Sequence, residues 1–196
     1  MFTDKPCAAG CGRPAITGYN LCFTHLANPE KEKVKICAFI EKNKIIKDLN
    51  VSGIRFENTD FSKHNIYGCN FKEAEFVNCN FSEVEIKMSF FDFSSFKKCI
   101  FTKSDLQFLS FAGSIFDACD FSWSDIVHVN FEGAYIFKTS FNNSNLYNSR
   151  YISAELSETT FVNCNLKRVN FAKSRQSEIL FKSSNTAEAV FELEDH

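Results

Sequence analysis

A large apolar side chain stands at every fifth residue of this chain, from Phe56 to Phe171. A period of five fits neither an α-helix nor a β-strand, because their side chains repeat every 3.6 and every 2 residues. The chain must therefore turn a corner after each five-residue segment to bury these residues together. Small residues such as Ala74, Cys79 and Ser104 stand two positions before most of the large ones. We expect both sets to point inward and the other three residues of each segment to point outward.

The kind of large residue repeats with a second period, of twenty. One set of positions is phenylalanine throughout, and another contains isoleucine and leucine alone. The first set is Phe61, Phe81, Phe101, Phe121, Phe141, Phe161 and Phe181, and the second is Ile66, Ile86, Leu106, Ile126, Leu146 and Leu166. Four segments therefore form one coil, and like side chains stack on the next coil at about the 4.8 Å strand spacing.

This pattern resembles the pentapeptide-repeat family, whose consensus is Ala-(Asp/Asn)-(Leu/Phe)-X-X. The resemblance covers roughly residues 49–191, and Cys79-Asn80-Phe81 is among the close matches. It implies an all-β solenoid, a right-handed quadrilateral β-helix, which we assign to residues 49–184. Some members of this family are known to protect DNA gyrase by imitating the shape and charge of duplex DNA.

Cysteines recur inside the predicted coils. Cys79, Cys99 and Cys119 are twenty residues apart and stack in one inward column. Coils about 4.8 Å apart are too widely spaced for the roughly 3.5–4.5 Å Cβ separation of a disulfide. We interpret these thiols as small apolar fillers rather than as a metal or redox ladder, and Cys69 and Cys164 likewise.

A different pattern precedes the repeats, in the predicted module of residues 1–27. Cys7, Cys11, Cys22 and His25 have the spacing C-x3-C-x10-C-x2-H. Three thiolates and an imidazole are the ligands of a closed structural zinc site, and zinc would supply the folding energy that so short a segment lacks. Residues 7–25 resemble small zinc-finger-like segments of phage and bacterial proteins. The open alternatives are Cys37 in place of His25, or a flexible tail without metal.

Residues 28–48 carry the signals of a capping helix. Asn28 can cap its start, and Pro29 suits the first helical position. Val34, Ile36, Cys37 and Ile40 would form its apolar face, and its lysines would face solvent. Such a helix would cover the open end of the β-helix, whose exposed strand edge otherwise invites association.

The pattern weakens near the C-terminus, in residues 185–196. Asn185 and Glu188 could form a capping box for a short helix with Val190, Phe191 and Leu193 on its apolar side. That helix would cap the β-helix or join two copies end to end as a homodimer. The alternative is that the repeats simply continue to Phe191.

Some outward positions are apolar where polar residues are expected, which indicates a contact surface for another protein. The predicted partner-binding residues are Met88, Phe90, Phe93, Phe108, Trp123, Val127, His128 and Tyr147. The alternative is that these side chains pack on each other or on the N-terminal helix.

The sequence predicts a protein without catalytic activity. It has no phosphate-binding loop and no grouping of Ser, His and Asp, and the interior of a β-helix is filled. We therefore expect a protein-interaction scaffold. A DNA mimic acting on gyrase is the second hypothesis, although residues 51–196 carry a net charge of only about −5. Nucleic-acid binding through the zinc module is the third. Without a signal peptide or a long apolar run, we expect a cytoplasmic protein that does not enter membranes.

Overall fold

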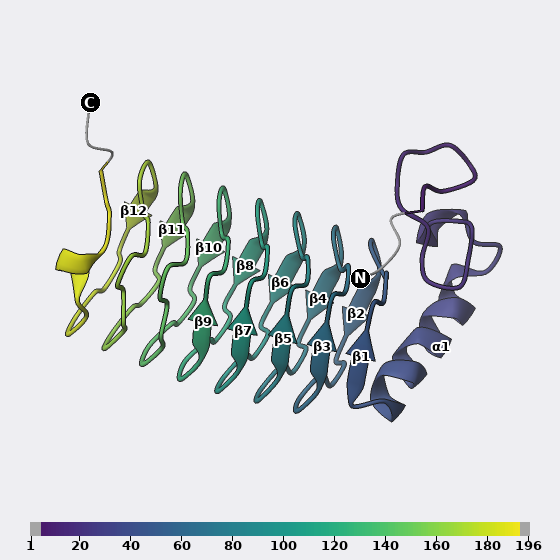
Figure 1. The fold of residues 1–196 in the computed structure, drawn as a ribbon, viewed down its shortest axis with the longest axis horizontal. Coiled ribbons are helices and arrows are strands. Elements are labelled where there is room, and N and C mark those ends of the chain that lie inside the picture. Colours follow the sequence, from purple (N-terminus) through teal and green to yellow (C-terminus); the bar gives the residue numbers. More distant parts are fainter. Residues whose placement is uncertain (1–4, 193–196) are drawn as a thin grey trace.

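A computed structural model describes residues 5–192 and shows a rod of stacked coils with one helix at its N-terminal end (Figure 1). Strands of three residues each form two parallel sheets. The five-stranded sheet contains β1 Ile45–Lys47, β3 Asn65–Tyr67, β5 Glu85–Lys87, β7 Asp105–Gln107 and β9 Asp125–Val127. The seven-stranded sheet contains β2 Arg55–Glu57, β4 Glu75–Val77, β6 Ser95–Lys97, β8 Ile115–Asp117, β10 Tyr135–Phe137, β11 Glu155–Ser157 and β12 Arg175–Ser177.

The register of the sheets confirms the predicted four-sided coil. Each strand pairs with the strand twenty residues further on, as Ile66 does with Ile86. Single bridges with the same offset form two more ladders, Asn50–Val190 and Asp60–Leu180. We number the sides in chain order: side 1 is the five-stranded sheet, side 2 the Asn50 ladder, side 3 the seven-stranded sheet and side 4 the Asp60 ladder.

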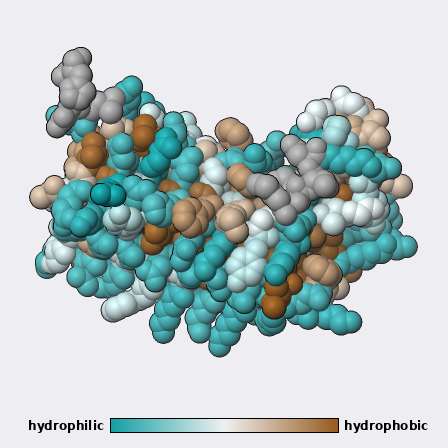
Figure 2. Space-filling view, viewed as in Figure 1, coloured by the Kyte–Doolittle hydropathy of each residue, from teal (hydrophilic) through white to brown (hydrophobic). Residues whose placement is uncertain are grey.

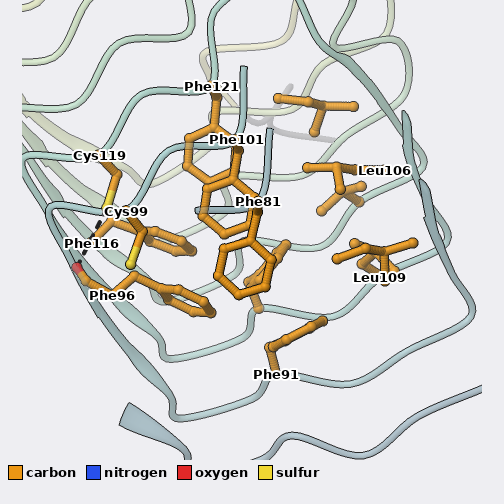
Figure 3. Close-up of a cluster of buried hydrophobic side chains, with 14 of the residues drawn as sticks. Phe81, Phe91, Phe96, Cys99, Phe101, Leu106, Leu109, Phe116, Cys119 and Phe121 are labelled. Atoms are coloured by element: carbon orange, nitrogen blue, oxygen red, sulfur yellow. Dashed lines mark hydrogen bonds between the residues drawn. The ribbon is translucent and has the colours of Figure 1, made fainter. Parts of the chain in front are cut away.

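The core consists of columns of like side chains (Figure 3). The rings of Phe61, Phe81 and Phe101 stack with centroids 4.5 Å apart at each step, and Phe121 follows at 4.4 Å. Leu106 represents the aliphatic column beside them. Such buried aromatic faces supply most of the apolar area that stabilises the rod.

The rod cysteines are small buried residues, as predicted. Cys79, Cys99 and Cys119 are all buried free thiols. The Sγ atoms of Cys99 and Cys119 each lie 3.5 Å from the backbone oxygen of a phenylalanine in the preceding coil, Phe76 and Phe96. A weak donor placed on a carbonyl fills this position without leaving a polar group unpaired.

Each corner of the rod holds a residue with positive φ, such as Met88 at 50° and Phe108 at 55°. This left-handed conformation costs an ordinary residue about 1–2 kcal/mol. Hydrogen bonds between coils offset the cost, since the N–H of Met88 donates to Gln107 O at 3.1 Å. The corner side chains are thereby aimed away from the core.

Helix α1 covers the N-terminal end of the rod but is shorter than predicted. It spans Pro29–Lys42, and the Asn28 side chain accepts a hydrogen bond from the Lys31 N–H at 3.1 Å. The predicted range 28–48 was too long. Ile46 lies in β1, belongs to the aliphatic column and pairs with Ile66 of β3. No helix among residues 5–192 is long and apolar enough to cross a membrane.

The predicted apolar face of α1 is only partly correct. Ile40 is fully buried, and Ile36 and Cys37 pack against the core, whereas Val34 is exposed. Below the helix, the buried His64 ring joins it to the rod, with Nε2 3.0 Å from Ile40 O.

Of the two alternatives for the C-terminal end, the described residues agree with the second: the repeats continue to Phe191, and no capping helix forms there. Only a 3-10 turn, η2 Thr186–Glu188, interrupts them. Asn185 accepts from the Leu166 N–H at 2.6 Å and makes no cap bond, and the Phe191 ring stacks on Phe171 at 5.1 Å. Residues 193–196, which include Leu193, lie outside the described residues.

Candidate functional site

The N-terminal segment brings the four predicted metal ligands together. One donor atom from each of Cys7, Cys11, Cys22 and His25 lies within 4.8 Å of every other. His25 Nδ1 is 3.4 Å from both Cys7 Sγ and Cys22 Sγ, and Cys11 Sγ is 3.6 Å from Cys22 Sγ. Tetrahedral zinc with usual bond lengths would place S and N about 3.6 Å apart and two S atoms about 3.8 Å apart. The observed distances fit this geometry closely.

Local backbone geometry creates the cluster. Gly10 and Gly12, on either side of Cys11, have φ of 72° and 78°, which allows the chain to fold back tightly around this cysteine. Short turns after Cys22 place His25 beside it, and the His25 N–H donates to Cys22 O at 3.0 Å. A backbone N–H of Cys22 directed at the Cys7 sulfur is the main cause that lowers the pKa of this thiol to about 6. A thiol that loses its proton near neutral pH is suited to a metal ligand.

Cys37, the alternative ligand, takes no part in the cluster. It lies in α1, half-buried and packed against the core, and burial raises the pKa of its thiol. Among the described residues, His25 and not Cys37 is therefore the fourth member of the group.

The metal-ligand segment docks on the first coil of the rod. The Thr17 N–H donates to Asn50 O at 3.0 Å, and the Asn50 N–H donates to Thr17 Oγ1 at 2.7 Å. The Asn50 side-chain amide also donates to Ala15 O at 3.0 Å. These bonds satisfy the edge of side 2, which the sequence did not predict because nothing local marks Thr17 as its partner.

The predicted partner-binding residues lie on sides 1 and 2 and their corners. Met88, Phe108 and His128 occupy successive coils at the corner between these two sides, and all three are exposed. The Phe108 and His128 rings stack at 5.0 Å, and the Tyr147 ring meets His128 edge-on at 5.8 Å. Val127 lies beside this corner on side 1, half-buried. We name Met88, Phe108, Val127, His128 and Tyr147 the aromatic corner.

The other three predicted residues do not belong to the aromatic corner. Phe90 lies half-buried on side 2, and the Lys72 ammonium is 5.1 Å from its ring centroid. Phe93 is on the far corner of side 2, and its ring covers Gly113. A Cβ atom on residue 113 would lie only 2.7 Å from the Phe93 ring. Trp123 is on the far corner of side 1 and is 63% exposed.

Further exposed apolar residues, which were not among the predicted partner-binding residues, lie on other sides of the rod. Ile115 and Tyr135 are both about half exposed on side 3, and Ile100 is exposed on side 4. The period of twenty would have located them, since each occupies an outward position. On the face shown in Figure 2, hydrophilic residues predominate and apolar ones are scattered among them.

Comparisons with known proteins agree with the architecture. The family model for pentapeptide repeats matches residues 50–87 and 114–150 in eight copies. No curated protein sequence matches the chain. Two trypsin-treated forms of QnrB1, a plasmid-mediated fluoroquinolone resistance protein, are similar in structure. The first has a TM-score of 0.62 at 17% identity and covers 72% of this chain and 75% of QnrB1. The second has a TM-score of 0.58 at 17% identity and covers 76% and 83%.

At 17% sequence identity, the similarity to QnrB1 shows a shared fold and nothing further. The repeated match of the family model, together with the four-sided coils, is specific: residues 50–87 and 114–150 of this chain are pentapeptide repeats.

Proposed function

We propose that the protein is a non-catalytic scaffold whose rod binds another protein at the aromatic corner. The observation that carries this proposal is the exposure of Met88, Phe108 and His128 at one corner of three successive coils. Aromatic residues and methionine are enriched at protein interfaces, and the corners hold them on a rigid backbone that loses little entropy on binding.

Affinity capture tests this proposal. The wild-type chain should retain one or more proteins that the double variant Met88→Lys, Phe108→Lys does not. The matched control is Ile100→Lys, Ile115→Lys, which adds the same charge at exposed apolar positions on sides 4 and 3. Recovery of the same proteins by the wild type and the first variant would refute the proposal.

Imitation of DNA is the second candidate function, because the structure is similar to a fluoroquinolone resistance protein. The charge distribution of the rod supports DNA imitation less than it supports the scaffold function. Many of its carboxylates are paired with lysine or arginine, as in Arg55–Glu75, Lys72–Asp92 and Arg150–Glu132, and cannot present the uncompensated row of charge that phosphates do. Protection of gyrase supercoiling activity by the purified chain would favour this candidate over the scaffold.

We further propose that the N-terminal cluster holds structural zinc. The donor set and its spacing support this ion. Metal analysis should find one zinc per chain in the wild type and in Cys37→Ser, and much less in Cys22→Ser. A Cys22→Ser protein that keeps a full equivalent of zinc would contradict the assignment. Nucleic-acid binding by this module, the third candidate, would appear as a salt-dependent shift of DNA.

A homodimer through the C-terminal end stays a proposal. Strand β12 is the last strand of its sheet, its three residues are exposed, and Leu180 in the same coil is exposed as well. The molar mass in solution, compared between the wild type and Leu180→Lys, tests it.

A further inference from the structure

The middle of side 1 contains a carboxylate whose environment differs from that of its neighbours. Glu85 and Asp105 share the ammonium group of Lys87, at 2.6 and 3.4 Å. Asp125 follows in the next coil of the same column and is exposed. Within residues 5–192, no lysine, arginine or histidine nitrogen forms an ion pair with it. The negative charge of Asp125 is therefore not compensated by a described cation.

The surrounding amides hold Asp125 in place without neutralising it. Asn185 donates to Asn165 at 3.4 Å, Asn165 to Asn145 at 2.8 Å, and Asn145 to Asp125 Oδ1 at 3.1 Å. This ladder of side-chain amides runs in one direction along side 1 and ends at the carboxylate. Its hydrogen bond fixes the orientation of the carboxyl group, which can still accept bonds at its other oxygen.

Apolar and aromatic groups flank the carboxylate on both sides. Within the same coil, Trp123 stands at the corner before Asp125, and Val127 and His128 follow it. In the adjacent coils, Phe108 stacks on His128 and Tyr147 contacts it. A partner that covers this surface would remove Asp125 from water, and an unpaired buried carboxylate is unfavourable. The partner must therefore bring a positive charge.

An arginine or lysine side chain fits these requirements. A guanidinium group can bind a carboxylate with two hydrogen bonds and also lie over an indole ring, and an ammonium group can do both less specifically. Val127 follows Asp125 by two residues on the outward face of β9, and Phe108 stacks on His128 at the corner beyond it, so an apolar residue should neighbour the cation in the partner.

We propose that side 1 around β9 binds a protein segment that places a cationic side chain on Asp125 and Trp123 and an apolar side chain on Val127 and Phe108. The inference rests on the proposed scaffold function and specifies the chemistry of the partner. It is independent of the N-terminal metal cluster.

Selection from a random peptide library displayed on phage tests the proposal on the full chain. Wild-type protein should enrich peptides in which arginine or lysine adjoins an apolar residue. Asp125→Asn, which keeps the oxygen that accepts from Asn145, should lose this enrichment. The matched control is Asp120→Asn on side 4, whose carboxylate accepts the Ser122 N–H at 2.9 Å. It should select the same peptides as the wild type.

A selected peptide, synthesised with a fluorophore, gives the affinity. Asp125→Asn should weaken its binding about tenfold or more, as expected for loss of a charge-assisted contact. Replacing the basic residue of the peptide with glutamine should weaken binding to the wild-type protein by the same factor. The same replacement should leave binding to Asp125→Asn almost unchanged.

The possible results separate the inference from the proposed function. Peptides without a basic residue that bind the wild type but not Phe108→Gly would support the scaffold and overturn the inference. Peptides that bind Phe108→Gly as well as the wild type, or no enrichment at all, would count against both. If the wild type proved to be a dimer that Phe108→Gly converts to monomers, a second copy would be the occupant and the inference would be wrong.

Discussion

At the scale of single residues, the five-residue pattern predicts whether a side chain points inward or outward better than it predicts which residues that side chain contacts. The period of five correctly placed Phe81 inside and Phe108 outside, because a coil with fixed corners leaves no other choice. It could not predict that Phe108 stacks on His128 or that the Phe93 ring covers Gly113. Such contacts depend on rotamers of side chains in neighbouring coils, which the sequence of one coil does not determine.

Tyr151 is the clearest misfit within the core. It replaces phenylalanine in a stack, with its ring 4.7 Å from Phe131 and 5.0 Å from Phe171, and its hydroxyl is buried without a hydrogen-bond partner. Leaving such a group unpaired costs about 1–3 kcal/mol. We expect Tyr151→Phe to raise the free energy of unfolding by about 1 kcal/mol, measured in urea. Phe131→Tyr should lower it, and a destabilised Tyr151→Phe protein would show that the hydroxyl has a partner.

The corner residues can be replaced by glycine with little effect on stability. Gly68 occupies the same corner column as Met88 and Phe108, at a φ of 61°. Glycine relieves the strain of the left-handed conformation at Phe108 but adds freedom to the unfolded chain, and the two effects nearly cancel. We expect Phe108→Gly and Trp123→Gly to change the free energy of unfolding by less than about 1 kcal/mol. Loss of several kcal/mol would show that these rings stabilise the rod.

The thiols of the rod should be chemically inert. The neighbouring Cys119 thiol is the main cause that raises the pKa of Cys99 to about 12, and burial raises that of Cys69 to about 11. At pH 8 Cys99 and Cys69 form almost no thiolate, and only thiolate attacks a disulfide reagent. With a chelator present, Ellman's reagent should label the exposed Cys11 quickly and the rod cysteines only on unfolding in denaturant. Equal labelling rates before unfolding would contradict this packing.

At the scale of elements, the strands were predictable and the boundaries of α1 were not. Stepping back from Phe56 in fives reaches Val51 and Ile46, both buried, so the pattern itself indicated that the rod begins before residue 49. The lysines near residue 47 resemble the polar face of a helix, and for this reason the helix was predicted to extend over the first strand of the rod. The metal ligands were predictable from their spacing, whereas the docking of Thr17 on Asn50 required the folded structure.

The N-terminal segment should leave the rod when metal is removed. Two of the five buried apolar residues in residues 5–26 are the ligands Cys7 and Cys22, so a bound metal should fix the loops of this segment. We expect chelation to abolish hydrogen-exchange protection of the Thr17 and Asn50 amides, which bond each other across the junction. The Phe81 and Phe101 amides, deep in the rod, should stay protected. Unchanged protection of Thr17 would show that the segment folds without metal.

At the scale of the whole molecule, the rod is a one-dimensional stack in which each coil contacts only its neighbours. Its two ends differ. The first coil is covered by α1 through Ile40, whereas the last described coil has the polar, exposed Gln176 where the column of Leu156 would continue. Stability is therefore expected to vary along the axis, unlike that of a globular core.

Hydrogen exchange measured along the rod should reveal this gradient. The central coils are hydrogen-bonded to a coil on each side, so amides such as those of Phe101 and Phe121 should open only when such a coil separates from its neighbours. The Leu180 amide, bonded to Thr159 O at 3.2 Å, lies in the last coil and should exchange with a smaller opening free energy. Replacement of Gln176 by isoleucine would extend the apolar column of side 3 over Leu156 and should slow exchange at Leu180 while leaving Phe101 unchanged. If all amides of the rod exchanged with one common free energy, the coils would unfold as a single unit and the nearest-neighbour description would be wrong.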